Sequence, residues 1–595
     1  MLLGNNRFLS PVESSGNISQ ESLGRYNPIT YLSLRSHHLC YNKHKVLNKL
    51  KIIYSPLFLS IFIFLFHQLA VFNLFSGLFD EGFLQYNAHL ITQGQVPYRD
   101  FFLSTTPGTF YVLAFFYKYL GSYIVIERIL GIFVVITTLF VCNKLFKLKT
   151  FWQYLYLISL ALLSVAPART FYYNDSTILF TLLALYFLIK GIEKDKMYLI
   201  VISGLMSGIS FLFKQSVGGL LFPAFIIGIF LVSNKNNFLK YILSYVVGGL
   251  AILAPVSFYF IFNNAFPQAL YYIFLFAGSA KSHQLSFLTH RLIAIPFVIL
   301  FFILLRRVKL KIKLLLISLA FLAFLFYLIL NTERIGRLLT YLPDPIFYVQ
   351  SLSLLFPLII LSLSLKIQKI ENRRLILIAI TYLVLFLSLA ASGYNIYPAM
   401  VVAPLFIPLL ISFSETYGKK LVKHAKVITL ATVLVIFGYT ITFSQNPLRF
   451  RDPVFGSYPE SHYIASLDIK EAQYMRFTPS ESKDLMRVIS YIRNNTKKDE
   501  KIFCFPYCPG LLFLSERNGG SYYSLFYFET FMEKDQNFVI NDLQKNNVNL
   551  VVLQKTGGIE QRKQLEEQRL SKIRNYITAN YSKVLETPNF IILRN

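Results

Sequence analysis

Long runs of hydrophobic residues, separated by short polar segments, fill the first three-quarters of the chain. The run at 55–75 matches the ~20 residues that cross a bilayer core, and the run at 297–305 covers a good part of that length. These runs predict a polytopic α-helical membrane protein with about 13 transmembrane helices. We expect the spans near residues 52–76, 122–144, 151–166, 176–190, 198–213, 216–233, 241–262, 292–305, 314–330, 347–365, 375–391, 398–413 and 427–443.

Two further hydrophobic stretches follow the first predicted span and do not fit a crossing. Residues 83–94 have the pattern of an amphipathic helix, and residues 107–120 are aromatic and aliphatic but too short to span. Proline and glycine punctuate both stretches. We therefore expect residues 77–121 to form a structured external loop with two short helices at the membrane interface.

The pattern changes after residue 443, where charged residues become frequent and the apolar runs shorten. Residues 482–496 have the pattern of an amphipathic helix, 500–506 and 589–595 that of strands, and 542–555 that of a helix followed by a strand. Alternating helices and strands predict a small α/β domain over 444–595. No nucleotide-binding fingerprint occurs in it.

Composition supports the membrane interpretation and orients the chain. The 595 residues are 55% hydrophobic and 15% charged, with a net charge of +28. The basic residues recur as short clusters between apolar runs, which the positive-inside bias explains better than nucleic-acid binding. With the N-terminus inside, the predicted cytoplasmic loops carry 21 Lys or Arg, against eight in the segments between spans on the other side. This asymmetry predicts a cytoplasmic, partly disordered extension at 1–50, a membrane module at 51–443 and an external 444–595.

Asp80 and Glu81 stand next to each other where the first predicted span ends. Two solvated loop acids are the simplest interpretation of the pair alone. Ionisable groups at membrane depth are, however, retained mainly where they face cavities or carry out chemistry. The structured, aromatic loop that follows them favours the second interpretation.

The ordered motifs of this loop carry a family resemblance. The sequence has D-E-G at 80–82, then A-x-L-x-x-x-G-x-x-P-Y-x-D-F ending at residue 101, then P-G at 107–108 before an aromatic helix. This resembles the first external loop of C-type glycosyltransferases, in the branch of protein O-mannosyltransferases and lipid A aminoarabinose transferases. Thr106 stands where many relatives have a first proline, which is expected to affect loop rigidity more than chemistry.

The resemblance implies a hexosyl- or pentosyltransferase. Such an enzyme moves a sugar, usually with inversion, from a polyprenyl-phosphate donor to a lipid, glycan or protein acceptor on the extracytoplasmic side. The family's first acid is the usual base, which maps to Asp80 as a loop aspartate, and Glu81 would position the acceptor or a metal. The leaving phosphate needs cationic stabilisation rather than a strong acid.

Several other residues are candidates for substrate binding, each with a simpler alternative. The resemblance places Lys214 at the carrier phosphate and Asp175 near the site, whereas snorkelling to the interface is the plain explanation for a lysine at a helix end. Arg169 and Asp175 are equally interpretable as a surface ion pair. The remaining candidates are Tyr98 and Arg99 within the loop motif, and Arg334 and Arg337, whose alternative role is interface anchoring.

Metal and cysteine signals are weak. His283 and His290 are seven residues apart, but exposed loop histidines are more frequent than ligands, so we assign no metal ligands and leave a divalent cation and other cofactors open. Cys504 and Cys508 are the only close pair among four cysteines and could form a disulfide if they lie outside the cytoplasm.

Two other functions remain alternatives. A transporter or flippase of lipid-linked saccharides would bury charges in mid-membrane cavities and often shows internal repeats, neither of which is visible here. A non-catalytic relative that binds a lipid or glycan is the second alternative. The plasma (inner) membrane is the expected location, since no retention signal for the endoplasmic reticulum is evident.

Overall fold

The structure is a computed structural model, and it describes most but not all of the 595 residues. They are residues 55–75, 77–164, 170–234, 236–276, 370–390, 398–421, 430, 450–452, 456–458, 463–526, 531, 533–555 and 563–595. Packing divides the chain into Met1–Leu59 and Ser60–Asn595. Apart from residues 55–59, all the described residues belong to the second unit.

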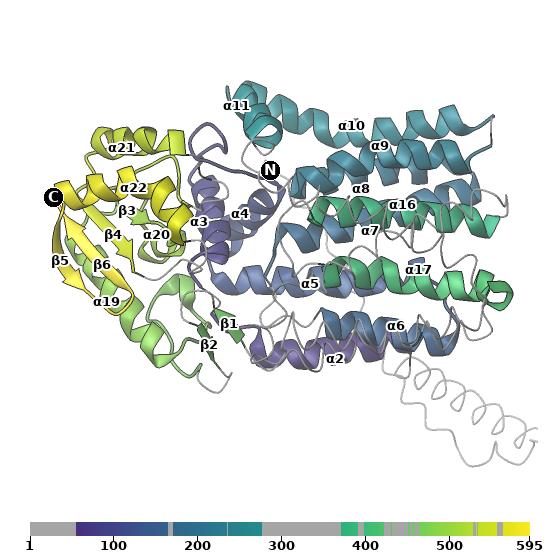
Figure 1. Cartoon of the computed structure of the whole chain (residues 1–595), viewed down its shortest axis with the longest axis horizontal. Helices are drawn as coiled ribbons and strands as arrows, with labels where there is room; N and C mark the ends of the chain where they lie inside the picture. The colour runs from purple at the N-terminus through teal and green to yellow at the C-terminus, as the bar shows by residue number, and fades with distance from the viewer. Residues whose placement is uncertain are drawn as a thin grey trace, which may run out of the picture. The chain divides into compact units, whose positions relative to one another are not determined.

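The apolar part of the chain folds into long helices (Figure 1). They are α2 (Pro56–Val71), α5 (Ile124–Leu145), α6 (Thr150–Leu163), α7 (Tyr173–Lys194), α8 (Met197–Phe213), α9 (Gln215–Val232), α10 (Phe238–Phe262), α16 (Ile370–Ala390) and α17 (Pro398–Leu421). Each coincides with a predicted span, although α2 is shorter and α17 longer than predicted. The predicted spans at 292–305, 314–330 and 347–365 lie outside the described residues, as does 427–443 apart from residue 430.

Among the described helices, α5, α7, α9 and α10 are long and apolar enough to cross a membrane by length and composition. Large hydrophobic side chains remain exposed along α2, α9 and α10, as expected of surfaces that face lipid. The helices therefore fit a multi-pass membrane protein.

Glycines set the spacing of the helices at the centre of this bundle. Helix α8 packs against both α7 and α10. A Cβ atom added to Gly204 of α8 would lie 2.0 Å from the carbonyl oxygen of Tyr245, and one added to Gly248 of α10 would lie 2.0 Å from that of Val201. The two backbones approach this closely only because neither residue has a side chain, which is a common device between membrane helices.

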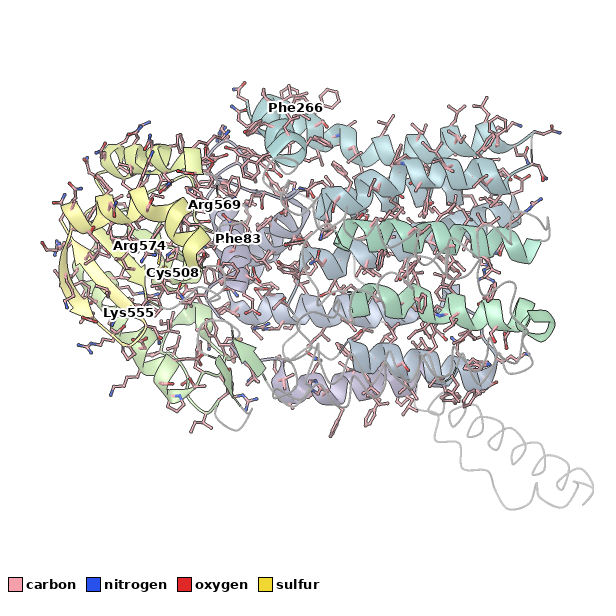
Figure 2. The ribbon with its side chains drawn as sticks, viewed as in Figure 1. Phe83, Phe266, Cys508, Lys555, Arg569 and Arg574 are labelled. Carbon is pink, nitrogen blue, oxygen red and sulfur yellow. The ribbon has the colours of Figure 1, made fainter. Side chains whose placement is uncertain are left out.

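Two short helices form between α2 and α5, as the sequence predicts. They are α3 (Asp80–Thr92) and α4 (Gly108–Leu120). They pack on each other, and Phe83 of α3, which is labelled in Figure 2, meets Phe110 of α4 edge-to-face with ring centroids 5.7 Å apart. A further short segment after α10 comprises α11 (Phe266–Leu270) and the π-helix η2 (Tyr271–Phe276).

The polar C-terminal part contains a mixed four-stranded sheet in the order β3-β4-β6-β5, in which only the β3–β4 pair is parallel. Its elements and the short hairpin before it are β1 (Phe450–Asp452), β2 (Gly456–Tyr458), η5 (Lys470–Ala472), α19 (Pro479–Asn495), β3 (Phe503–Phe505), α20 (Pro509–Ser515), η6 (Glu533–Asp535), α21 (Gln536–Lys545), β4 (Leu550–Gln554), α22 (Lys563–Asn580), β5 (Ser582–Glu586) and β6 (Phe590–Arg594). The predicted helix at 482–496 is α19, which begins with a capping box between Thr478 and Glu481.

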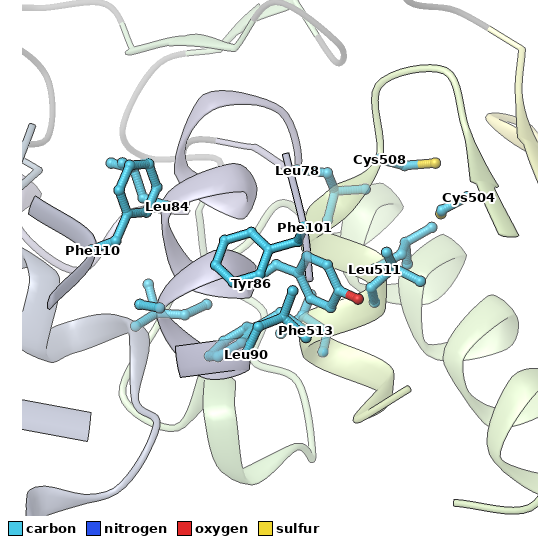
Figure 3. Close-up of a cluster of buried hydrophobic side chains, with 14 of the residues drawn as sticks. Leu78, Leu84, Tyr86, Leu90, Phe101, Phe110, Cys504, Cys508, Leu511 and Phe513 are labelled. Carbon is cyan, nitrogen blue, oxygen red and sulfur yellow. The ribbon is translucent and has the colours of Figure 1, made fainter. Parts of the chain in front are cut away.

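Helices α3 and α20 share one hydrophobic core, although about four hundred residues separate them. Leu84 and Tyr86 of α3 belong to the same buried cluster as Leu511 and Phe513 of α20 (Figure 3). The Tyr86 hydroxyl accepts a hydrogen bond from the backbone N–H of Gly519 at 2.6 Å. The segment 77–121 is therefore shaped by residues that lie about four hundred positions later in the sequence.

Candidate functional site

Asp80 is the first residue of α3, which corrects its expected place in a loop. Its side chain is exposed, so a ligand can reach it. The protein around the carboxyl group nevertheless removes much of its hydration. This desolvation, and to a lesser extent the charge of Glu81, raises the pKa of Asp80 from 3.8 to about 7. An accessible carboxyl group with such a pKa exchanges a proton readily near neutral pH.

Glu81 has a different environment from its neighbour. It is buried, and both of its carboxylate oxygens accept hydrogen bonds from Arg128 of α5, at 2.5 Å from Nη1 and 2.7 Å from Nη2. Arg128 is fully buried and also donates to the backbone carbonyl of Leu74 at 3.0 Å. This bidentate pair fixes the start of α3 against α5. The predicted role of Glu81 at the acceptor or a metal stays a prediction.

A second buried carboxyl group lies beside this ion pair. Glu127, which precedes Arg128, accepts a hydrogen bond from the side chain of Gln85 of α3 at 2.9 Å. It also interacts electrostatically with Glu81 and Arg128. Arg128, Glu127 and Gln85 were not among the predicted site residues. The signal available for them was two adjacent charged residues inside an apolar span, which is itself rare.

Lys214 stands at the junction between α8 and α9. The residue has an extended backbone conformation there, and its side chain is only 5% exposed. Its ammonium group donates a hydrogen bond to Oδ1 of Asn174 at 2.6 Å and lies 5.6 Å from the ring centroid of Tyr173. The charge is thus kept among the first residues of α7 and does not snorkel to the surface.

Tyr173 connects this lysine to the acidic pair. It interacts electrostatically with Asp80, while its ring faces the Lys214 ammonium group. The hydroxyl of Tyr172 donates to that of Tyr173 at 2.8 Å, and the two rings are 4.1 Å apart. Tyr173, which the sequence did not single out, therefore contacts Lys214 and is influenced by the charge of Asp80. Asp175, also predicted, is half-buried in the same first turn of α7.

Tyr98 and Arg99 lie in other surroundings. Tyr98 is 1% exposed, and its hydroxyl donates to the carbonyl of Thr105 at 2.6 Å, so it contributes to the core and offers no open surface to a substrate. Arg99 is exposed and pairs with both oxygens of Asp100 at 2.8 Å, with a further bond to the carbonyl of Asn263. The Arg99 guanidinium holds the pKa of Asp100 below its usual range.

The other predicted residues cannot be placed. Arg169, Arg334 and Arg337 lie outside the described residues, as do His283 and His290. Within the described part of the chain, no three His, Cys, Asp or Glu side chains are grouped to hold a metal ion.

Comparison with known proteins gives one family. Residues 104–262 match the family model described as dolichyl-phosphate-mannose-protein mannosyltransferase. None of the curated proteins matches the chain.

Solved structures give distant likenesses. The oligosaccharyltransferase of Archaeoglobus fulgidus, in complex with Zn and sulfate, is 12% identical to this chain with a TM-score of 0.43. The matched region covers 84% of this chain and 68% of the oligosaccharyltransferase chain. ArnT from Cupriavidus metallidurans bound to undecaprenyl phosphate is 10% identical, covers 90% and 96% respectively, and has a TM-score of 0.38.

Proposed function

We propose that this chain, a member of the C-type glycosyltransferase superfamily, transfers a hexose or pentose from a polyprenyl-phosphate donor to an acceptor on the extracytoplasmic side. The acceptor is a lipid, glycan or protein. The reaction inverts the anomeric carbon by a single in-line displacement. The observation that carries the proposal is the accessible Asp80 carboxyl group with its raised pKa, whose charge acts on Tyr173, the residue that the Lys214 ammonium group contacts.

Asp80 acts as the general base. The acceptor hydroxyl gives its proton to the Asp80 carboxylate while its oxygen forms a bond to the anomeric carbon. The bond from that carbon to the phosphate oxygen breaks, and its electron pair leaves with the polyprenyl phosphate. A base whose pKa lies near the working pH combines a large ionised fraction with a strong affinity for the proton. Its pKa of about 7 suits this task.

Lys214 binds the phosphate of the donor. Asn174 and the Tyr173 ring keep its ammonium group in a fixed position between α8 and α9. A fixed cation stabilises the negative charge that grows on the leaving phosphate without having to reorganise during the reaction. The Tyr173 ring contacts this cation, and its hydroxyl accepts a hydrogen bond from that of Tyr172. Asp175 in the same turn contributes a second carboxylate near the donor.

Glu81 acts as a positioning residue. Its two oxygens are engaged by Arg128, so its contribution is to hold the first turn of α3 and thereby the adjacent Asp80. This differs from the role expected from the sequence, where Glu81 contacts the acceptor or a metal. Geometry held within fractions of an ångström is what proximity catalysis requires.

The orientation follows from the charge distribution. The protein lies in the plasma (inner) membrane, with residues 1–50 on the cytoplasmic side and residues 77–121 and 444–595 on the outer side. The C-terminal part packs on α3 and so stands beside the acidic pair. We assign it a role in acceptor recognition.

The direct test replaces Asp80 by Asn in the purified full-length protein. Transfer of a labelled sugar from polyprenyl-phosphate hexose and pentose donors is measured with mixed acceptors. We expect transfer to fall by at least ~100-fold, because removing a general base typically costs ~10² to 10⁴ in rate. Asp499→Asn, an exposed carboxylate between α19 and β3, makes the same chemical change elsewhere and should leave transfer intact.

Three results would contradict the proposal. Full activity of the Asp80→Asn variant would rule out Asp80 as the general base. A donor lipid that crosses the bilayer in reconstituted vesicles, with no transfer by the wild type, would favour a flippase. Labelling of the 77–121 loop from the cytoplasmic side would leave the base on the wrong side of the membrane.

A further inference from the structure

The side chain of Gln215 joins the first residue of α9 to the loop that precedes α4. Its amide nitrogen donates a hydrogen bond to the carbonyl of Ser104 at 3.0 Å, and its amide oxygen accepts one from the backbone N–H of Thr106 at 3.2 Å. One amide group thus pairs with a carbonyl and an N–H of the same backbone segment, which fixes both the distance and the orientation between the two parts of the chain. Gln215 directly follows Lys214 in the sequence.

Two further contacts join the same parts of the chain. The hydroxyl of Thr106, a fully buried residue, donates to the carbonyl of Phe211 in the last turn of α8 at 2.8 Å. A Cβ atom added to Gly108, the first residue of α4, would lie 2.6 Å from the carbonyl oxygen of Leu212, so the two backbones are in direct contact. The start of α4 therefore packs against the end of α8 (Figure 1). A shift of this loop would move the residues on both sides of Lys214.

Lys214 occupies a break between two helices, so its backbone depends on such contacts. The residue is extended, with φ −150° and ψ 109°, where α8 ends and α9 begins. Its ammonium group is bonded to Asn174 of α7, and the hydroxyl of Ser388 in α16 donates to the carbonyl of Ser216 at 2.9 Å. Gln215 supplies the contact to the loop before α4, which neither of these bonds provides.

We propose that Gln215 is a positioning residue that acts through Lys214. Its side-chain amide holds the 104–106 loop against the break between α8 and α9, and this keeps the Lys214 ammonium group where the donor phosphate binds. The proposal rests on the proposed function, which assigns that phosphate to Lys214. A cation that is already fixed binds a phosphate without first being ordered, so its affinity depends on the contacts that hold its backbone.

Replacing Gln215 by Met tests the contact, because methionine has nearly the same length but no amide. Initial rates of transfer by the purified full-length protein are titrated with donor and, separately, with acceptor. We expect the donor KM to rise at least ~5-fold and the acceptor KM to change less than ~2-fold, since the loss of two hydrogen bonds loosens the cation and not the acceptor site. Gln544→Met, at an exposed position of α21, makes the same change elsewhere and should leave both KM values intact.

This pattern separates positioning from a purely structural role. A variant that is only less well folded has a smaller active fraction, which lowers the apparent kcat and leaves both KM values unchanged. An unchanged donor KM in Gln215→Met would therefore overturn the proposal, whatever happens to kcat.

The same substitution in a Lys214→Met background shows whether Gln215 acts through the lysine. With the ammonium group removed, there is no cation left to position. Adding Gln215→Met should then lower kcat/KM for the donor by less than ~2-fold, against at least ~5-fold when Lys214 is present. Equal losses in the two backgrounds would contradict the proposal, because Gln215 would then act independently of Lys214.

Thr106 provides a rescue series on the other side of the contact. Thr106→Pro removes both the N–H that binds Gln215 and the hydroxyl that binds the carbonyl of Phe211, so it should raise the donor KM as Gln215→Met does. Thr106→Ser keeps both groups and should restore the donor KM of the wild type. A serine variant as impaired as the proline variant would count against the contact.

Binding of a polyprenyl phosphate without a sugar separates this proposal from the proposed function. Its Kd is measured by thermophoresis in detergent, and Gln215→Met should raise it at least ~5-fold. Wild-type binding without transfer of any sugar would refute the proposed function and leave the role of Gln215 standing. Equal Kd values for the wild type and Gln215→Met would overturn that role and leave the proposed function standing. A wild type that does not bind the lipid at all would overturn both.

Discussion

Removing Arg128 gives the sharpest test of how the acidic segment is held. The Arg128→Met change keeps much of the side-chain volume but removes the guanidinium that donates to Glu81 at 2.5 and 2.7 Å and to the Leu74 carbonyl at 3.0 Å. The two partners of the ion pair are 0% and 8% exposed. Water therefore cannot replace the lost donors without a rearrangement of α3.

The magnitude follows from the burial of the group left behind. Breaking a buried ion pair by removing one partner typically costs about 3–5 kcal/mol, because an uncompensated charge remains. Glu127 adds to this cost, since it interacts with both Glu81 and Arg128, and two carboxyl groups would then face each other without a cation. We expect Arg128→Met at the upper end of this range. Glu81→Gln should cost less, roughly 1–3 kcal/mol, because Arg128 keeps Glu127 and Leu74 as partners.

The assay is a double-mutant cycle on unfolding in detergent, accompanied by transfer kinetics. The double variant Glu81→Gln/Arg128→Met should be more stable than the sum of the single changes predicts, with a coupling of at least ~2 kcal/mol. Both single variants should lower kcat more than they raise KM, because they move the base and not the donor site. Additive effects on stability, or unchanged kcat in Arg128→Met, would refute the argument.

Three further predictions concern the site and its support. Because Asp80 has a pKa of about 7, kcat/KM should fall as pH drops below about 7. Its pKa is raised from 3.8 in the folded protein, so its ionisation lowers the free energy of unfolding increasingly as the pH rises from 3.8 to about 7. The Asp80→Asn variant should therefore have a higher Tm than the wild type above about pH 7. Lys214→Met should raise the donor KM at least ~10-fold while Lys214→Arg keeps more of the affinity, as titration of initial rates with donor would show. Gly82→Ala should lower the free energy of unfolding by about 1–3 kcal/mol, since its Cβ would lie 2.4 Å from the Gly510 backbone. Gly94→Ala has nothing within 4 Å of its Cβ and should lower it by only ~1 kcal/mol, through backbone strain. Denaturant unfolding measures both.

The regular elements were predictable where a single period dominates the pattern. The span expected at 122–144 is the helix Ile124–Leu145, and the short helix expected at 107–120 is Gly108–Leu120. Strand β5 was not predicted, because it is an edge strand with mostly exposed side chains and lacks the apolar run that marked β6. Helix α22 was also missed, since its sequence is largely polar.

The site was predictable only where one residue was conspicuous by itself. Asp80 and Lys214 stand out because charges next to apolar runs are rare. The partner of Glu81 lies 47 residues away, inside a span whose average hydropathy hides it. Tyr173 is one of 39 tyrosines, and only the packing of α7 against α8 makes it the neighbour of Lys214. Such non-local pairings have no period that a sequence can display.

The core shared by α3 and α20 has a consequence for how the sequence of this protein can evolve. A C-terminal segment without contacts to α3 could be trimmed, exchanged or lost without disturbing that helix. Here Leu84, Tyr86, Leu511 and Phe513 are packed together, so the two distant regions must vary in concert. A chimera that borrows its final 130 or so residues from a relative should succeed only when the donor's α3 is transplanted with them.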